Sequence, residues 1–289
     1  MGRERRTPPA ESPRTRLSDG SLARVAPSEF TSGWELLVDE TPQSHVDLDD
    51  PTHLHFEYVA RMGAVIDTFR PAGDAITAVH LGAGALTIPR YVAVTRPGSR
   101  QQVVELEGGL WDLVRENLPL PRGAQIRVRI GDARAVVERM PAGILGQVDL
   151  VVSDVFSGAR TPAHVTSVEF YTSLAKLLTS SGVVLVNIAD GPGLAFTRRQ
   201  VATLRQVLPH VAVLAEAQVL KGRRFGNLVL AASREPLPDE WLPRLLAAGP
   251  HPAKIASGAE VATLSRDAGP VSDADAVPSP APNSSLFER

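Results

Sequence analysis

A regular alternation of short apolar runs and helical segments between residues 75 and 207 limits the folds open to this chain. The apolar runs are nearly continuous, as in strands that are buried on both faces of a parallel sheet. Helical segments between them supply the crossovers that parallel strands require. The expected strands lie at 75–81, 101–106, 125–130, 148–153 and 182–188, and the expected helices at 86–95, 109–118, 133–140, 165–179 and 193–207.

Two further strand-like runs, at 211–217 and 225–233, end the alternation. The polar turn between them is too short for a parallel crossover, which needs a dozen or more residues, so an antiparallel hairpin at the sheet edge is expected. A double-wound dinucleotide domain would continue with more strand–helix units. Residues 236–265 are expected to form one or two helices on the outside.

The segments on either side of this alternation are expected to form a hairpin, a helix and two tails. Residues 34–48 hold two apolar-containing runs broken by Thr41-Pro42-Gln43, which is typical of a β-hairpin, and a helix is expected over 54–69 with Tyr58 on its apolar face. Both ends of the chain are rich in Pro and Ser and bury too little apolar surface to become ordered. The predicted organisation is a disordered tail over 1–33, a hairpin over 34–53, one α/β domain over 54–267 and a tail over 268–289.

Composition excludes several classes of protein. The 30 Lys and Arg residues against 32 Asp and Glu residues do not suit a strongly basic nucleic-acid binder. Without cysteine there is no disulfide framework, thiolate nucleophile or cysteine zinc site, and the histidines lack a metal-ligand spacing. No apolar run approaches the length of a membrane helix or follows the charged N-terminus as in a secretory signal. We expect a soluble, cytoplasmic protein without metal, membrane or nucleic-acid partners.

Four consecutive strand ends carry glycine or an acidic residue, and ligands of open α/β sheets bind at these carboxyl ends. Glycine lets the backbone approach a ligand closely, and an acid that ends the second strand can accept both hydroxyls of a ribose. An Asp after the third strand can accept from an adenine amino group, so the pattern predicts a nucleoside site. Its residues are Gly82, Gly84, Glu105, Asp132, Ala133 and Asp154.

The nucleoside could belong to NAD or to an S-adenosyl compound, because Glu105 suits both. A dinucleotide fingerprint has Gly or Ala at its sixth position, where this sequence has Thr87. Two acids beside a sulfonium cation are electrostatically favourable, whereas two acids beside a pyrophosphate are not. The sequence therefore favours an S-adenosyl-type ligand.

Residues 34 to about 233 resemble the spermidine synthase (polyamine aminopropyltransferase) family, in particular its divergent bacterial spermidine synthase-like members. The resemblance implies a class I S-adenosylmethionine-dependent methyltransferase-like fold: a Rossmann-like sheet that ends in an antiparallel hairpin, preceded by a small N-terminal β-hairpin. It also implies a homodimer. The residues that carry it are the hairpin with Gln43, Gly82-Ala83-Gly84, Val104-Glu105-Leu106-Glu107, Gly131-Asp132-Ala133, Val152-Ser153-Asp154, Glu169-Phe170-Tyr171 and Ser181-Gly182-Val183.

On the donor side, the resemblance implies decarboxylated S-adenosylmethionine as the donor and no metal. Gly82 and Gly84 would approach its aliphatic chain, Glu105 would hold the ribose, and Asp132 with the backbone of Ala133 would hold the adenine. The acid that this family carries in its glycine-rich turn is absent here. Its absence fits S-adenosylmethionine itself, because an acid there would repel the donor's carboxylate.

On the acceptor side, the resemblance makes Asp154 the general base or the carboxylate that orients an amine, and Gln43 and Ser157 acceptor-binding residues. The family's D-x-x-D motif, which grips a diamine, reads Asp154-Val155-Phe156-Ser157 here, and Arg160 would repel a dication. A polyamine acceptor is therefore disfavoured. Three hypotheses stay open: aminopropyl transfer to an amine, methyl transfer to an acceptor that is not a polyamine, and a non-catalytic nucleoside-binding homologue.

Overall fold

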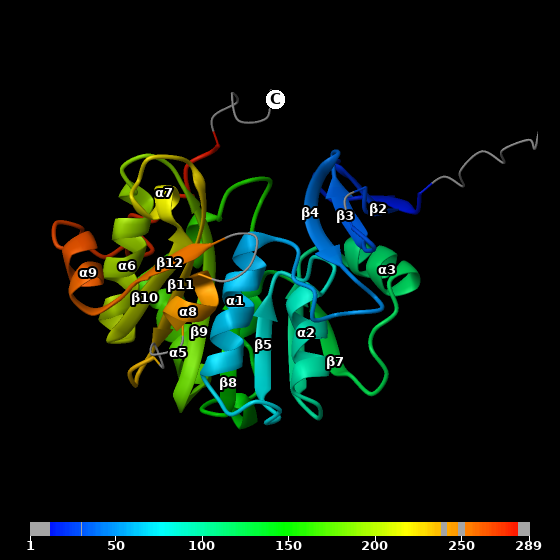
Figure 1. The fold of residues 1–289 in the computed structure, drawn as a ribbon, viewed down its shortest axis with the longest axis horizontal. Helices are drawn as coiled ribbons and strands as arrows, with labels where there is room; N and C mark the ends of the chain where they lie inside the picture. Colours follow the sequence, from blue (N-terminus) through cyan, green and yellow to red (C-terminus); the bar gives the residue numbers. More distant parts are fainter. Residues whose placement is uncertain (1–11, 30, 238–241, 248–251, 283–289) are drawn as a thin grey trace, which may run out of the picture.

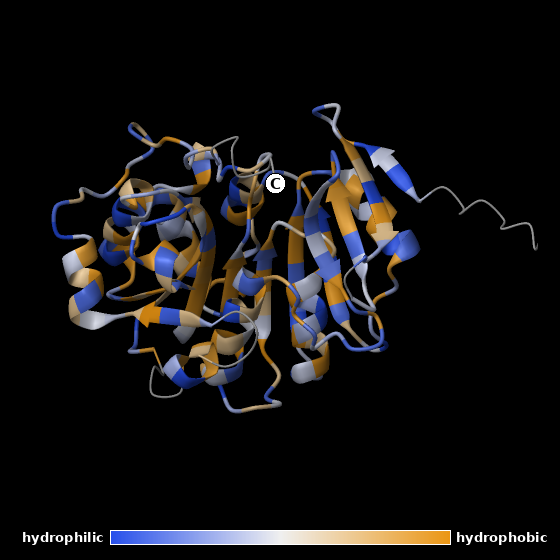
Figure 2. Ribbon diagram, turned by 45° about the horizontal axis from the view of Figure 1, so that its top comes forward, coloured by the Kyte–Doolittle hydropathy of each residue, from blue (hydrophilic) through white to orange (hydrophobic). Residues whose placement is uncertain are grey.

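The structure is a computed structural model that describes residues 12–29, 31–237, 242–247 and 252–282. Two sheets organise the chain: a small antiparallel sheet near the N-terminus and a large mixed sheet with helices on both faces (Figure 1). Apolar residues concentrate in the strands of the large sheet (Figure 2). No helix in the described ranges has the length and apolar character needed to cross a membrane.

Five parallel strands form most of the large sheet and lie close to the predicted positions. They are β5 (Thr77–Leu81), β6 (Arg100–Glu105), β7 (Gln125–Ile130), β8 (Val148–Ser153) and β9 (Leu178–Asp190). β5 pairs with β6 and β8, β7 pairs with β6, and β9 pairs with β8. Because all five run the same way, their carboxyl ends meet at one edge, where ligands of such sheets bind.

Helices cover both faces of this sheet. Buried side chains such as Val65 and Val92 form an apolar cluster on the first face, and Leu174 and Leu204 belong to a separate cluster on the second. The first face carries α1 (Glu57–Thr68) and α2 (Thr87–Thr95), and the second carries α4 (Ala133–Glu138), α5 (Val168–Leu177) and α6 (Ala195–Val207). The remaining connections contain α3 (Gly108–Asn117) and two 3-10 turns, Ala142–Ile144 and Ala163–Val165.

The predicted antiparallel hairpin is present as β10 (His210–Glu216) and β11 (Gly226–Ser233), with the short helix α7 (Ala217–Leu220) between them. Its predicted place at the sheet edge is wrong, because β12 (Ala253–Ala256) pairs with the outer side of β10. Two short helices flank β12, α8 (Leu242–Ala247) and α9 (Gly258–Leu264). The complete strand order is β12-β10-β11-β9-β8-β5-β6-β7, the Rossmann-like order of the expected fold class.

The small sheet contains the predicted hairpin and more. Its strands are β1 (Arg14–Arg16), β2 (Leu22–Pro27), β3 (Trp34–Val38) and β4 (Thr41–Val46). The β3–β4 turn is Asp39-Glu40, with φ of 45° and 63°, rather than residues 41–43. β1 and β2 lie in the predicted disordered tail, which is a correction for the described part of it. They are ordered because Ala23 and Val25 are buried in a cluster with side chains of α3; residues 1–11 lie outside the described residues.

The C-terminal tail also differs from the prediction. Residues 268–282 carry almost no regular structure, but Val271 and Ser279 are buried. The Val271 carbonyl accepts from the Val168 N–H at the start of α5, at 2.8 Å. Polar backbone and side-chain contacts hold this segment in place. The amino-acid composition, on which the prediction of a tail rests, does not reveal such contacts. Residues 283–289 lie outside the described residues.

Candidate functional site

The turn after β5 is held between two other elements. Gly82 has φ of +85°, and a Cβ atom there would collide with the backbone carbonyl of Asp154. Gly84 has φ of +48°, and a Cβ atom there would collide with Oγ of Ser44 on β4. The same Ser44 oxygen accepts from the Ala85 N–H at 3.1 Å. Both glycines therefore permit close packing inside the protein, and Ser44 fastens the small sheet to the turn.

Glu105, at the end of β6, turns its carboxylate toward this glycine turn. One oxygen accepts from the Ala83 N–H and the other from the Glu107 N–H, each at 2.9 Å. Burial raises the pKa of Glu105, while these backbone donors oppose the rise. The carboxylate is thus fixed in position, and each oxygen retains a lone pair for a further donor such as a ribose hydroxyl.

Asp132 caps α4 and also contacts a histidine side chain. Its Oδ1 accepts from the Ala135 N–H at 2.9 Å, and its Oδ2 lies 2.8 Å from Nε2 of His164. Burial disfavours ionisation of Asp132, but the backbone of Ala135 and the His164 side chain outweigh it and lower its pKa. Ala133 opens the helix beside it, and Gly131 N–H bonds to the Glu105 carbonyl at 2.8 Å, so the ends of β6 and β7 are adjacent.

Asp154 follows β8 and is the centre of a small polar group. The Nδ2 of Asn187, on β9, donates to its Oδ1 at 2.9 Å, and the hydroxyl of Tyr58, on α1, also hydrogen-bonds to it. Burial raises the pKa of Asp154, while both hydrogen bonds oppose the rise. Burial and the charge of Asp154 in turn raise the pKa of Tyr58 well above its usual value. A carboxyl group whose pKa is raised by burial is a stronger base than an exposed one, which suits it to accept a proton.

Gln43 and Ser157 were predicted to bind the acceptor. In the described structure, neither side chain forms a hydrogen bond with Asp154. The Gln43 amide donates to the Thr41 carbonyl of its own strand at 3.4 Å, whereas its neighbour Ser44 reaches the glycine turn. Ser157 lies on the exposed tip of the loop after Asp154, where its backbone pairs with Arg160. Their acceptor roles stay predictions.

Other polar residues have structural partners. Asp190, at the end of β9, accepts from the backbone and hydroxyl of Thr197, both at 2.7 Å, and so ties down the first turn of α6. The rings of His45, His53 and His55 lie together, with centroids 4.6 to 6.3 Å apart. Among the described residues, no group of three or more His, Asp or Glu side chains is arranged to hold a metal ion.

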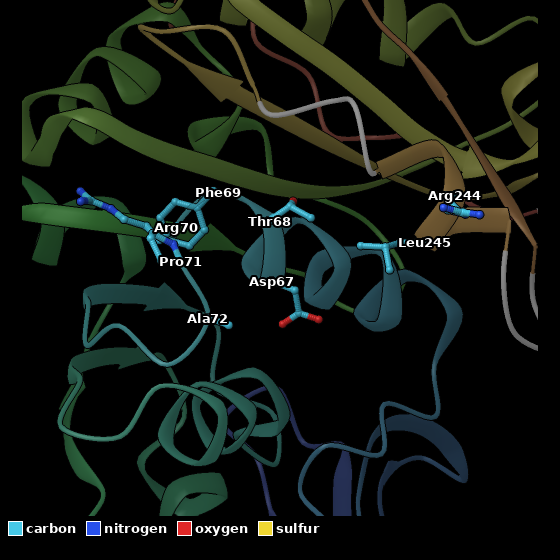
Figure 3. Close-up of a pocket in the computed structure, with 8 residues that line it drawn as sticks. All are labelled: Asp67, Thr68, Phe69, Arg70, Pro71, Ala72, Arg244 and Leu245. Atoms are coloured by element: carbon cyan, nitrogen blue, oxygen red, sulfur yellow. The ribbon is translucent and has the colours of Figure 1, made fainter.

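A cavity of about 520 Å³ lies at the opposite end of the large sheet (Figure 3). Residues 67–72, which connect α1 to β5, and Arg244 and Leu245 of α8 line it. Arg70 in this wall is paired with Asp149 at the start of β8, at 2.5 Å. The cavity is therefore at the amino ends of the parallel strands, away from Glu105 and Asp154.

Sequence reasoning missed Tyr58, Asn187 and Ser44. Tyr58 fits the apolar face of its helix, so periodicity alone assigns it to the core. Asn187 left a visible signal, since it is the one polar side chain in the buried run from Val183 to Ala189. Ser44 left none, because its role depends on how the small sheet meets the turn.

The chain is 31% identical to a probable spermidine synthase from Corynebacterium glutamicum ATCC 13032, whose crystal structure superimposes with a TM-score of 0.82 over 92% of this chain and 97% of that one. The chain belongs to the spermidine synthase-like family. The superposition covers nearly all of both chains, and this chain has the Rossmann-like sheet and the small N-terminal sheet that were expected, so the family resemblance and the fold class are confirmed. No protein-family model matches the chain.

Two further comparisons cover smaller parts of the chain. A polyamine aminopropyltransferase from Vibrio vulnificus (strain CMCP6) is 32% identical over 135 residues, which are 46% of this chain and 44% of that protein. The match thus spans less than half the length of this curated relative. Human methyltransferase-like protein 13, in complex with SAH, superimposes with a TM-score of 0.50 at 18% identity over 66% of this chain and 90% of that one. This likeness concerns the methyltransferase fold.

Proposed function

We propose that this spermidine synthase-like chain is a transferase that binds an S-adenosyl donor and uses Asp154 on an amine acceptor. The observation that carries the proposal is the Asp154 group: a partly buried carboxyl of raised pKa, oriented by Asn187 and Tyr58, next to the glycine turn. A carboxyl that only capped a helix would not need two side-chain donors from separate elements.

The donor would lie along the ends of β5, β6 and β7. Glu105 would accept from its ribose hydroxyls, and Asp132 with the Ala133 backbone would hold the adenine. Leu106 and Ile130 support this placement, because they are large apolar side chains that are 62% and 51% exposed at the same edge. Exposed apolar side chains beside fixed polar groups are typical of a site for a flat heteroaromatic ring.

The proposed step is aminopropyl transfer from decarboxylated S-adenosylmethionine. An amine of pKa near 10 must first lose a proton, which Asp154 accepts. The amine nitrogen then forms a bond to the carbon beside the sulfonium, the carbon–sulfur bond breaks, and its electron pair stays on sulfur to give methylthioadenosine. Asn187 supports this step, because its Oδ1 is buried without a hydrogen-bond partner in the described structure and can accept a hydrogen bond from the amine N–H, which orients the nucleophile.

The proposed acceptor has one amine rather than two. Ser157 stands where the family's second carboxylate would grip the far end of a diamine, and a serine hydroxyl offers no charge to a second ammonium. In this proposal Gln43 and Ser157 contact the neutral part of the acceptor.

The second candidate is a methyltransferase that acts on another acceptor. It is favoured by the turn from Gly82 to Leu86, which carries no acid and is fastened by Ser44 instead. Intact S-adenosylmethionine keeps a carboxylate at this place, and a neutral turn does not repel it.

Calorimetric titration with S-adenosylmethionine, decarboxylated S-adenosylmethionine and methylthioadenosine tests the proposal. Tighter binding of the last two supports aminopropyl transfer, and tighter binding of intact S-adenosylmethionine supports the methyltransferase. The Glu105→Gln variant serves as the control, because loss of its charge should weaken all three ligands. If none of the three binds to the wild-type protein, both transferase proposals are wrong and a non-catalytic homologue is favoured.

A further inference from the structure

The last described segment of the chain reaches the candidate site. We define the C-terminal strap as residues 271–279 and the Asp154 loop as residues 155–161. The strap and the arrowhead of β5 lie at the same end of the molecule (Figure 1). Every other residue of the candidate site comes from the small sheet or from positions 58–187, so the strap is distant from all of them in sequence.

Ser279 closes the far end of the Asp154 loop. Its N–H donates to the Thr161 carbonyl at 3.0 Å, and its Oγ accepts from the Thr161 N–H at 2.9 Å. Its carbonyl accepts from Nε of Arg160 at 2.6 Å. Ser279 is fully buried and Thr161 is 3% exposed, so these bonds are shielded from water. Arg160 thus supports the loop as well as facing solvent.

The near end of the loop is fixed independently. The Asp154 N–H donates to the Leu81 carbonyl of β5 at 2.8 Å. Between the two ends, the Ser157 N–H donates to the Arg160 carbonyl at 2.9 Å, which folds the exposed tip back on itself. In the described part of the chain, the strap therefore holds Arg160 and Thr161, through which the chain leaves the tip that carries Ser157.

Asp273 fixes the strap beside the adenine side of the candidate site. Its carboxylate accepts two bonds from Arg134 at 2.6 Å each and one from the Ser167 hydroxyl at 2.6 Å. Arg134 also donates to the His164 carbonyl at 3.1 Å, and His164 pairs with Asp132. Arg134 above all, together with Ser167, lowers the pKa of Asp273 to about 2. The strap is thus joined to Asp132 through two side chains.

We propose that Ser279 and Asp273 are positioning residues: Ser279 sets the acceptor side through the Asp154 loop, and Asp273 sets the donor side through Arg134 and His164. The inference rests on the proposed function, in which these two sides bind acceptor and donor. The strap is then a structural part of the site rather than a tail, and the two anchors act on different substrates.

Three single variants of the full chain test this inference: Ser279→Ala, Asp273→Asn and the matched control Asp275→Asn. Asp275 lies on the same strap but pairs with Arg199 on α6, away from the loop. Hydrogen exchange measures the amides of Ser157 and Arg160, and calorimetry measures methylthioadenosine affinity. Ser279→Ala should speed exchange roughly fivefold, as expected for one lost buried hydrogen bond, with nucleoside affinity unchanged. Asp273→Asn should weaken nucleoside binding by roughly threefold to tenfold.

The control should change neither measurement beyond its effect on overall unfolding, which a thermal melt records. Equal effects of all three variants would show general destabilisation and overturn the inference. Unchanged loop exchange in Ser279→Ala would overturn it as well, whatever the affinity. Because exchange needs no ligand, failure of the wild-type protein to bind methylthioadenosine contradicts the proposed function and leaves the loop measurement to decide the role of Ser279.

Discussion

At the scale of single residues, the Asp154 carboxyl group is proposed to act in catalysis, and in its ionised form it lowers the free energy of unfolding. Burial raises its pKa, so the unfolded chain ionises at a lower pH than the folded protein does. The free energy of unfolding therefore falls as pH rises through this window, and the ionised group destabilises the fold above it. Such a cost is expected where a carboxyl group is kept for catalysis rather than for packing.

Replacing Asp154 with Asn should separate the two effects. We expect transfer to fall by roughly 100-fold to 10,000-fold, because no base remains, and the free energy of unfolding at neutral pH to rise. The matched control is Asp149→Asn on β8, the strand that Asp154 follows; its carboxylate pairs with Arg70. It should lower stability and leave transfer unchanged. Urea unfolding measures the free energy of unfolding, and an assay of the transferred group measures the rate of transfer. Lower stability in Asp154→Asn would contradict the account of its pKa.

Tyr58 offers a finer test of the same carboxyl group. Its hydroxyl lowers the pKa of Asp154, so Tyr58→Phe should raise that pKa further. The acidic limb of the pH profile of kcat/KM should then move to higher pH, while the plateau rate at high pH falls little. A profile that only drops, without moving along the pH axis, would show that Tyr58 acts on packing or on substrate instead.

At the scale of elements, the sequence predicted the five parallel strands, their covering helices and the terminal hairpin within a few residues. Continuous apolar runs and helical periodicity report burial directly, and the acids at strand ends indicate the edge of the sheet where ligands bind. β1, β2 and β12 were missed because they owe their order to neighbours such as α3 and β10. Asn187 and Tyr58 were missed for a related reason, since only the folded sheet brings β9 and α1 to Asp154.

The junction between β4 and the glycine turn can be tested with Gly84→Ala. The new Cβ atom would meet the Ser44 hydroxyl, and the positive φ adds backbone strain. Gly73→Ala is the matched control, because it also has positive φ, +82°, but nothing within 4 Å of the added atom. We expect Gly84→Ala to cost about 1–3 kcal/mol more than the control in thermal unfolding. Equal losses would show that backbone strain alone matters at this turn.

At the scale of the whole molecule, the candidate site is assembled from parts that the sequence separates widely. Ser44 comes from the small sheet, Asn187 from β9 and Ser279 from the strap, and each contacts the glycine turn or the Asp154 loop or holds Asp154 itself. Local sequence patterns identify the acids at the strand ends. They do not identify the supporting side chains, which come from distant parts of the chain. Those supports also mean that the stability of both sheets bears on the site.

Two buried histidines give both sheets a common response to acid. His45 in the small sheet and His80 on β5 are each 1% exposed, and burial lowers the pKa of each to about 4. For His45, the nearby His55 and His53 add to the shift, and Asp47 opposes it. As pH falls from the ordinary value of 6.5 toward 4, the unfolded chain takes up protons that the folded protein does not, so stability is lost in this window.

Urea unfolding between pH 7.5 and 4 should show this loss, with each histidine contributing up to about 1.4 kcal/mol per pH unit. His45→Asn and His80→Asn should each flatten the slope by one proton. Because the two side chains belong to different sheets, the double variant should flatten it by the sum of the two. A double variant whose slope equals that of the wild type would show that acidic groups, rather than these histidines, control the response to acid.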